Sequence, residues 1–127
     1  MHRITHVALW TRDLDASRAF YERFFGGIVG EMYHNPMRKF TSYFLTFEDD
    51  TRLELMSLPK LADGVEGPQT GWAHIAFSVG SREQVEALTE SIRQAGYTVA
   101  SEPRTTGGGY YESVVQDPDG NLVEITV

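Results

Sequence analysis

The chain has 127 residues, of which 41% are hydrophobic and 23% are charged, and it contains no cysteine. This length suits one domain, and no apolar run approaches the roughly 20 residues that span a bilayer, so the composition argues against a membrane protein. The formal net charge of −7 opposes a phosphate backbone, which excludes nucleic acid as an expected partner. The first residues lack the basic and apolar regions of a secretory signal, so we expect a cytoplasmic protein. Without thiolates, any metal site must use His, Asp and Glu.

The first half of the sequence predicts a strand, a helix and three further strands. A run of β-branched and aromatic residues at 4–10 reads as a strand that carries His6. Asp13 or Asp15 can cap a helix over 14–25, which the following glycine pair ends. The later strands are expected over 28–33, 40–47 and 52–56, with turns at 34–39 and 49–50.

The second half repeats this order after residues 59–70, a stretch with Pro, Gly and acidic residues that we interpret as a linker. A strand over 72–79 carries His74. Ser81-Arg82-Glu83-Gln84 has the pattern of a capping box, and Gly96 ends the helix that it starts. The apolar face of this helix is expected to consist of Val85, Leu88, Ile92 and Ala95. After the helix we expect strands over 97–100, 110–116 and 121–127, a loop over 103–109 and a turn over 117–120.

Matching segments in the two halves of the sequence are separated by nearly the same number of residues. The segment Thr5-His6-Val7-Ala8-Leu9 matches Ala73-His74-Ile75-Ala76-Phe77, and Leu53-Glu54-Leu55 matches Val123-Glu124-Ile125. Independent coincidences would not share an offset of 68 to 70 positions, so the pattern indicates an internal repeat. We therefore expect a single domain over 1–127, made of module 1 (1–58) and module 2 (71–127), joined by the linker 59–70.

Each half carries one His and one Glu at matching places. Because strand side chains alternate, each Glu points away from its apolar neighbours. A lone His or Glu on a strand is more often structural than a ligand, but one repeat that places four such residues weakens that interpretation. His2 and His34 lack repeat partners and are interpreted as surface residues. If the halves pack around a pseudo-twofold axis, four candidate ligands converge on one cation: His6, Glu54, His74 and Glu124.

The repeat, this quartet and the ending Asp117-Pro118-Asp119-Gly120-Asn121-Leu122-Val123-Glu124 resemble the vicinal oxygen chelate (VOC) superfamily, also called the glyoxalase/bleomycin resistance/dioxygenase family. The resemblance covers essentially the whole chain. It implies an α+β fold in which two tandem βαβββ modules form a partly open mixed β-barrel, glyoxalase-like, around a divalent metal. It also implies a homodimer, in which the quartet is assembled within one chain or across two.

Within the superfamily, a His, Glu, His, Glu quartet looks most like glyoxalase I. Extradiol dioxygenases and fosfomycin-modifying enzymes typically use His, His and one Glu, and bleomycin-sequestering members generally lack the quartet. For a short chain of bacterial type, the resemblance implies one divalent metal per site, nickel or cobalt rather than zinc.

The resemblance implies a metal-dependent lyase or isomerase of the glyoxalase I type. It converts the hemithioacetal of a 2-oxoaldehyde and a thiol into a 2-hydroxyacyl thioester. A divalent ion can stabilise the enediolate while a carboxylate moves the proton between adjacent carbons. The resemblance makes Glu124 the catalytic base and Glu54 its symmetric partner.

The sequence departs from this family pattern at the thiol. Many glyoxalases place an Arg four residues after the first His to hold a glutathione carboxylate, and this chain has Trp10 there. Arg38, Lys39 and Arg104 are either alternative anion contacts or ordinary surface cations. The aromatic residues that can wall a pocket or instead belong to the core are Trp10, Phe44, Trp72, Tyr110 and Tyr111.

Two rival functions therefore stay open. One is a metal-dependent VOC enzyme that acts on a different small oxo or hydroxy substrate, as an epimerase or lyase. The other is a metal-free protein that binds or sequesters a small ligand. The same small-molecule cleft would serve all three functions, because one fold hosts several chemistries.

Overall fold

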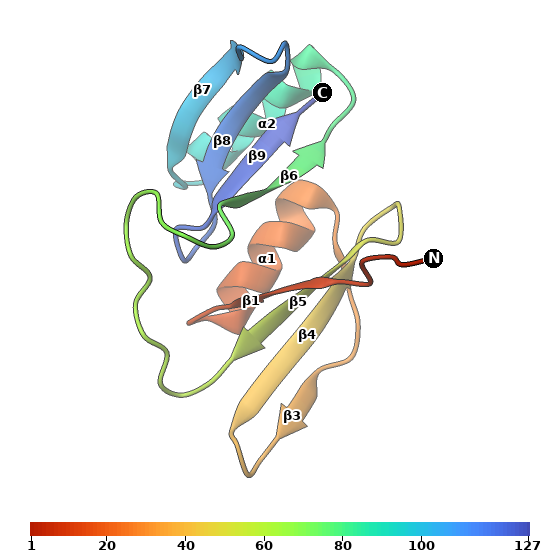
Figure 1. Ribbon diagram of the computed structural model, residues 1–127, viewed down its shortest axis with the longest axis vertical. Helices are drawn as coiled ribbons and strands as arrows, with labels where there is room; N and C mark the ends of the chain where they lie inside the picture. The colour runs from red at the N-terminus through yellow and green to blue at the C-terminus, as the bar shows by residue number, and fades with distance from the viewer. The chain divides into compact units, whose positions relative to one another are not determined.

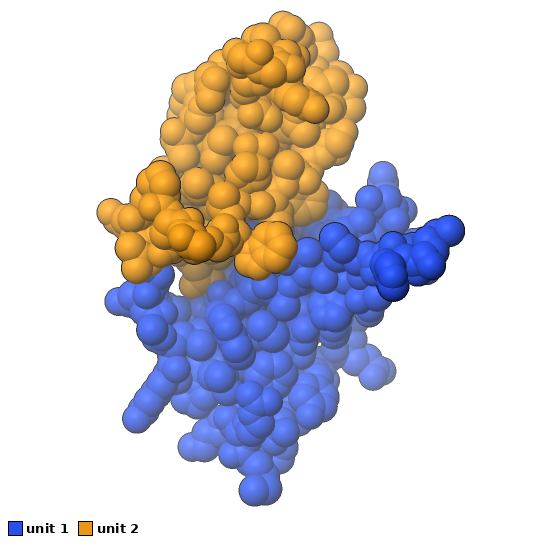
Figure 2. Space-filling view, in the orientation of Figure 1, with its two compact units in different colours: residues 1–64 blue, residues 65–127 orange.

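The computed structural model describes residues 1–127 and divides into two compact units, residues 1–64 and 65–127 (Figure 2). In each unit one helix packs on one face of one open β-sheet (Figure 1). The boundary between the units falls inside the Pro- and Gly-containing segment 59–70. The predicted α+β class with two similar modules is confirmed. Neither helix is both long and apolar enough to cross a membrane.

Unit 1 has the strand order β1-β5-β4-β2, and β3 also pairs with β4. The β1 and β5 strands are parallel and the other pairs are antiparallel. The elements are β1 (Val7–Trp10), α1 (Leu14–Phe25), β2 (Ile28–Val29), β3 (Tyr33–Asn35), β4 (Phe40–Thr46) and β5 (Arg52–Ser57).

The sequence predicted one strand over 28–33, and the structure corrects this to two short strands. Both β2 and β3 pair with β4, but residues 30–32 between them are not in a strand. The Gly30 amide still donates to the Phe44 carbonyl at 2.8 Å, which keeps the chain beside β4 across the interruption. Unit 1 is therefore βαββββ rather than βαβββ.

The α1 helix begins and ends where its local chemistry predicts. The Asp13 side chain, and not that of Asp15, is the N-cap and accepts a hydrogen bond from the Ala16 amide at 3.0 Å. Gly26 ends the helix with a left-handed backbone, φ 68°, which a residue with a Cβ adopts only at a cost.

Unit 2 has the predicted βαβββ order and the strand order β6-β9-β8-β7. The β6 and β9 strands are parallel, as β1 and β5 are in unit 1. Ser81 caps the helix by accepting from the Gln84 amide. The elements are β6 (His74–Ser78), α2 (Arg82–Gln94), β7 (Val99–Thr105), β8 (Tyr111–Gln116) and β9 (Leu122–Thr126).

The β7 strand extends further than the sequence predicted. We expected a strand to end at residue 100 and a loop to begin at Pro103, but β7 continues to Thr105. It lies at the edge of the sheet, and its register with β8 shifts between Ser101 and Arg104. An edge strand with such an irregularity tolerates a proline, because no ladder hydrogen bond depends on its missing N–H.

The core of each unit lies between its helix and its sheet. In α2, Val85 and Ile92 are buried as predicted and Thr89 is fully buried, whereas Leu88 and the C-cap residue Ala95 are only half-buried. The buried apolar side chains are Phe20, Tyr21, Phe24, Leu45, Leu53 and Leu55 in unit 1, and Val85, Ile92, Val115, Val123 and Ile125 in unit 2. Each sheet therefore has one face covered by a helix. Along each strand, the residues between the buried ones point to the opposite face of the sheet.

Candidate functional site

In unit 1, His6 and Glu54 meet on the sheet face that lies opposite α1. Glu54 stands between two buried leucines of β5, and it is in register with Ala8 on β1, two residues after His6. The His6 Nε2 atom lies 3.7 Å from a Glu54 carboxylate oxygen. The Thr5 hydroxyl lies 2.8 Å from His6 Nδ1, and this hydrogen bond orients the ring with Nε2 toward the carboxylate. Phe44, opposite Glu54 on β4, contacts the imidazole edge to face, with ring centroids 5.1 Å apart.

In unit 2, His74 and Glu124 meet in the same way. Glu124 is in register with Ala76 on β6, two residues after His74. The His74 Nε2 atom lies 3.1 Å from a Glu124 carboxylate oxygen. Burial raises the pKa of the Glu124 carboxyl, His74 opposes this shift, and Glu112 adds to it. The carboxyl therefore lies in a partly desolvated place with a second carboxylate nearby.

These two pairs have the chemistry of divalent metal ligands. The Glu54 and Glu124 side chains are only 15% and 19% exposed, and each faces an imidazole. A partly buried carboxylate is costly unless a cation balances it, and a bound divalent ion would supply that charge. Imidazole nitrogen and carboxylate oxygen together suit Zn, Ni and similar ions. The donor set therefore fits a divalent metal.

The structure brings the predicted quartet together as two pairs, one in each unit. His6 meets Glu54, and His74 meets Glu124. Neither unit by itself collects a group of three His, Asp or Glu side chains suited to a metal. Convergence of the two pairs on one ion stays a prediction. The other two histidines, His2 and His34, are exposed as expected, and His34 Nδ1 lies 2.9 Å from the Thr41 hydroxyl.

The candidate pocket aromatics lie in different surroundings. Trp10 is 46% exposed, and Trp72 and Tyr110 are more exposed still, so none of these three is a core residue. Phe44 shares the sheet face of the His6–Glu54 pair. Tyr111 lies on the other face of its sheet, where its hydroxyl donates to Glu86 of α2 at 2.6 Å. Among these residues, Trp10 and Phe44 are the ones placed on the face of the unit 1 sheet that carries His6 and Glu54, which we call the site face.

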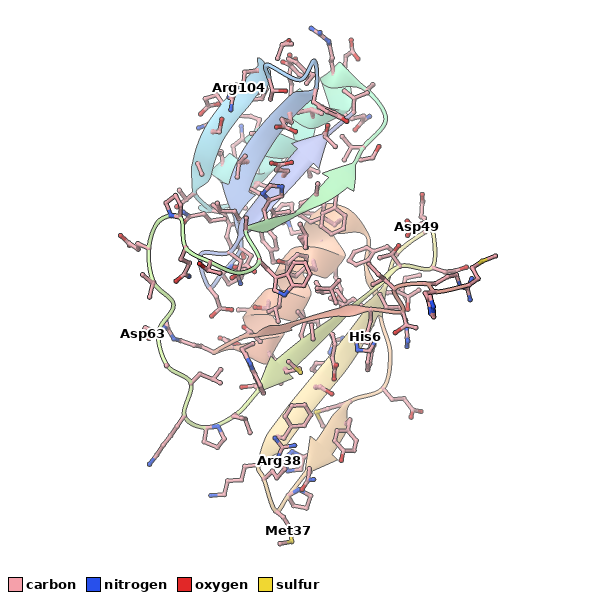
Figure 3. The ribbon with its side chains drawn as sticks, in the orientation of Figure 1. His6, Met37, Arg38, Asp49, Asp63 and Arg104 are labelled. Atoms are coloured by element: carbon pink, nitrogen blue, oxygen red, sulfur yellow. The ribbon has the colours of Figure 1, made fainter.

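The candidate cations also differ. The Arg38 guanidinium lies 5.3 Å from the Phe40 ring centroid at the tip of the β3–β4 hairpin, where Figure 3 labels it beside Met37. Lys39 is exposed at the same tip, and Arg104 donates to the Ser101 hydroxyl at 3.3 Å on β7.

Two residues beside the pairs escaped the sequence analysis. Arg52 lies on the site face of unit 1, two residues before Glu54, with its guanidinium carbon 4.7 Å from the Phe44 ring centroid. The alternation of β5 could have revealed it. Glu112 acts on Glu124 from the adjacent strand β8. No local pattern marks it, because strand register alone brings these two residues together.

Residues 3–125 match the family model of the Glyoxalase/Bleomycin resistance protein/Dioxygenase superfamily. The chain belongs to this superfamily. The membership confirms the resemblance that the repeat and the quartet indicated. The paired modules, each with one His–Glu pair beside a parallel strand pair, are therefore those of a VOC protein.

The relatives of this VOC protein are named for different enzyme activities. A probable lactoylglutathione lyase from Vibrio cholerae is 33% identical, over 98% of this chain and 89% of its own length. An ethylmalonyl-CoA/methylmalonyl-CoA epimerase from Cereibacter sphaeroides is 29% identical, over 97% of this chain and 96% of its own. The crystal structure of glyoxalase I from Zea mays matches with a TM-score of 0.78 and 27% identity, over 98% of this chain and 44% of the maize chain.

Proposed function

We propose that this VOC protein is a metal-dependent lyase of the glyoxalase I type, which converts a 2-oxoaldehyde–thiol hemithioacetal into a 2-hydroxyacyl thioester. The observation that supports it is the duplicated His–Glu pair. In both units the Glu is in register with the alanine two residues after the His, and the Nε2 atom faces the carboxylate. A pair repeated with the same register and the same facing atoms supports two matching halves of one ligand set.

In this proposal the four side chains His6, Glu54, His74 and Glu124 hold one divalent ion, nickel or cobalt in preference to zinc. When bound, the ion supplies positive charge that stabilises negative charge developing on the two substrate oxygens. Glu124 takes the proton from one carbon of the substrate and returns it to the neighbouring carbon. Glu54 is its symmetric partner. We expect a cytoplasmic homodimer that acts on a small molecule.

Metal binding tests the first half of the proposal. Protein freed of metal with a chelator and titrated with nickel should take up one ion per four-ligand site. His6→Ala and His74→Ala should each lower the nickel affinity at least about tenfold, because each removes one ligand. His34→Ala is the matched control, since His34 is exposed and hydrogen-bonds to Thr41. Uptake of less than about one tenth of an ion per chain would instead support a metal-free ligand-binding protein.

Turnover tests the second half. The nickel-loaded protein should isomerise the methylglyoxal hemithioacetal of glutathione or of another cellular thiol, measured by formation of the thioester. Glu124→Gln should remove most of this activity, about 10² to 10⁴ in kcat, and leave the circular dichroism spectrum unchanged. Wild-type protein that binds metal but is inactive with every thiol tested would overturn the thioester assignment.

Trp10 favours one alternative, a VOC epimerase or lyase that acts on a different small oxo or hydroxy substrate. Its ring is 46% exposed on the site face, where it offers an apolar surface and no charge for a glutathione carboxylate. An epimerase exchanges the proton on the substrate carbon with solvent. Deuterium uptake from heavy water into an acyl thioester, without isomerisation of hemithioacetals, would support this alternative.

A further inference from the structure

The site face of unit 1 carries a group of aromatic rings beside the His6–Glu54 pair. The Trp10 and Phe40 ring centroids are 6.1 Å apart with an interplanar angle of 88°, and those of Tyr33 and Phe40 are 6.0 Å apart at 58°. We call Trp10, Tyr33 and Phe40 the aromatic face. Trp10 and Tyr33 are 46% and 56% exposed, so their rings are open to contact.

Strand register shows that the aromatic face is continuous with the candidate metal ligands. Trp10 is in register with Met56, Met56 with Ser42, and Ser42 with Tyr33. Paired residues in adjacent strands point to the same side, so this row shares the face of Glu54, which precedes Met56 by two residues. At the rise of a β-strand, the row lies about 7 Å from Glu54. A molecule of ordinary metabolite size can therefore lie beside Glu54 and contact the rings.

A positive charge lies at the far end of the aromatic face. The Asn35 side chain accepts hydrogen bonds from the Met37 and Arg38 amides, at 3.1 and 3.2 Å, which stabilise the turn at the hairpin tip. Lys39 completes the turn at φ 55°, an uncommon conformation for a residue with a side chain. The Arg38 guanidinium of this turn lies over the Phe40 ring. A cation beside exposed rings suits a ligand that carries both an aromatic ring and an anionic group.

The scaffold itself does not require these rings. The unit 2 residues in the row that corresponds to Trp10, Met56 and Ser42 are Ser78, Thr126 and Glu112, and that sheet forms with the same pairing. Trp10 and Tyr33 lie on the face away from the core with about half of each side chain exposed, so packing in the core does not account for them. Their presence in unit 1 alone therefore points to a contact that only unit 1 makes.

We propose that the aromatic face binds the non-reacting part of the substrate, and that this part is a flat aromatic ring carrying an anionic group. The ring stacks on Trp10 and Tyr33, and the anion pairs with Arg38. The inference rests on the proposed function only in naming Glu54 and its partners as the reacting end. The recognition of the ring and anion rests on the contacts of unit 1 alone.

The test uses fragments that cannot react. The intact protein is titrated by NMR with 2-naphthoate, with its saturated analogue decahydro-2-naphthoate, and with neutral 2-naphthylmethanol. We expect amide shifts to concentrate in β1 and in the β3–β4 hairpin, and 2-naphthoate to bind at least about fivefold more tightly than either analogue. Equal binding of the saturated acid, or shifts only elsewhere in the chain, would overturn the proposal.

Matched variants locate the two contacts. Trp10→Leu keeps an apolar side chain and should weaken 2-naphthoate binding about fivefold or more, whereas Trp10→Phe should retain most of it. Arg38→Gln should weaken 2-naphthoate about threefold and leave the neutral alcohol unaffected. Arg23→Gln is the control, because the Arg23 guanidinium also lies over a ring, that of Phe24 on α1. Naphthoate binding that none of the site variants changes would contradict the inference.

The outcome is separable from that of the proposed function. Fragment binding with no isomerase activity would contradict the glyoxalase I assignment alone. Isomerase activity with no preference for the aromatic anion would contradict this inference alone. Circular dichroism of each variant shows whether a loss of binding is a loss of fold.

Discussion

The residues beside Glu54 and those beside Glu124 occupy corresponding places, but they differ in chemistry. Opposite Glu54 lies Phe44, and the next row toward the end of the strand holds Met56 and Trp10. Opposite Glu124 lies Val114, and the corresponding row holds Thr126 and Ser78. In unit 1 a cation, Arg52, precedes the Glu by two residues; in unit 2 a second carboxylate, Glu112, acts on the Glu.

The other faces of the two sheets are much more alike. Both faces bury leucine, valine or isoleucine against a helix. Both also include two buried hydroxyl groups that hydrogen-bond to each other, one from the helix and one from a segment packed beside it. In unit 1 this pair is Thr11 and Ser17, at 2.6 Å, and in unit 2 it is Thr89 and Ser113, at 2.7 Å. Close packing against a helix restricts the residue types on the covered face of both sheets. The residues on the site faces do not pack in the core, so they can differ according to what each face contacts.

The largest expected difference between the units concerns the two glutamates. Glu124→Gln should lower kcat by about 10² to 10⁴, the usual contribution of a general base. Glu54→Gln should act mainly through metal affinity, so its activity should recover in part when nickel is in excess. Measuring kcat together with bound nickel separates the two effects. Equal losses at saturating nickel would show that the two units contribute equivalent bases.

A smaller difference concerns the buried hydroxyl pairs. Thr89→Val should lower the free energy of unfolding by about 1–3 kcal/mol, because it leaves the buried Ser113 hydroxyl without this partner. Ser17→Ala should cost about 1 kcal/mol, since the Thr11 hydroxyl also bonds to the Asp13 backbone. Urea denaturation measures both. The double variant Thr89→Val/Ser113→Ala should regain part of the loss, and a further loss would contradict the assignment.

The support of the two histidines differs as well. Thr5 bonds to His6 Nδ1, whereas the residue before His74 is Ala73, which has no hydroxyl. Thr5→Ala should lower the nickel affinity a few-fold, less than the about 10- to 100-fold typical of buried outer-shell partners, because this hydrogen bond is exposed. Thr5→Ser should restore the affinity. A Thr5→Ala protein that binds nickel as the wild type does would show that the two histidines need no such support.

The smallest expected effect lies in the turn between β4 and β5. Hydrogen bonds from the Thr51 hydroxyl and amide lower the pKa of Asp49. A lowered carboxyl pKa contributes stability above its unfolded value of about 3.9, and this contribution is lost as the pH falls through the lowered folded pKa. Asp49→Asn should therefore unfold in urea with a slightly weaker pH dependence below about pH 4. An unchanged acid dependence would argue against these hydrogen bonds.

Local chemistry explains which elements could be predicted from the sequence. The α1 helix was predicted with its observed ends, because a capping side chain and a glycine act within one turn of the helix. The β2 and β3 strands and the end of β7 were not, because a strand exists only where a partner supplies hydrogen bonds. The break at residues 30–32 and the continuation of β7 through Pro103 follow from pairing with β4 and β8, and not from the local sequence.

By itself, the sequence determined the repeat, the helix limits and the two His–Glu pairs, because periodicity, capping and the common offset are properties of the chain. The tertiary structure decided which side chains surround each pair. Phe44 reaches His6, and Glu112 reaches Glu124, through antiparallel register between strands. Trp10 meets Phe40 because β1, β5 and β4 pair side by side. These neighbours are distant in sequence, and only hydrogen-bonded strand pairing brings them onto one face.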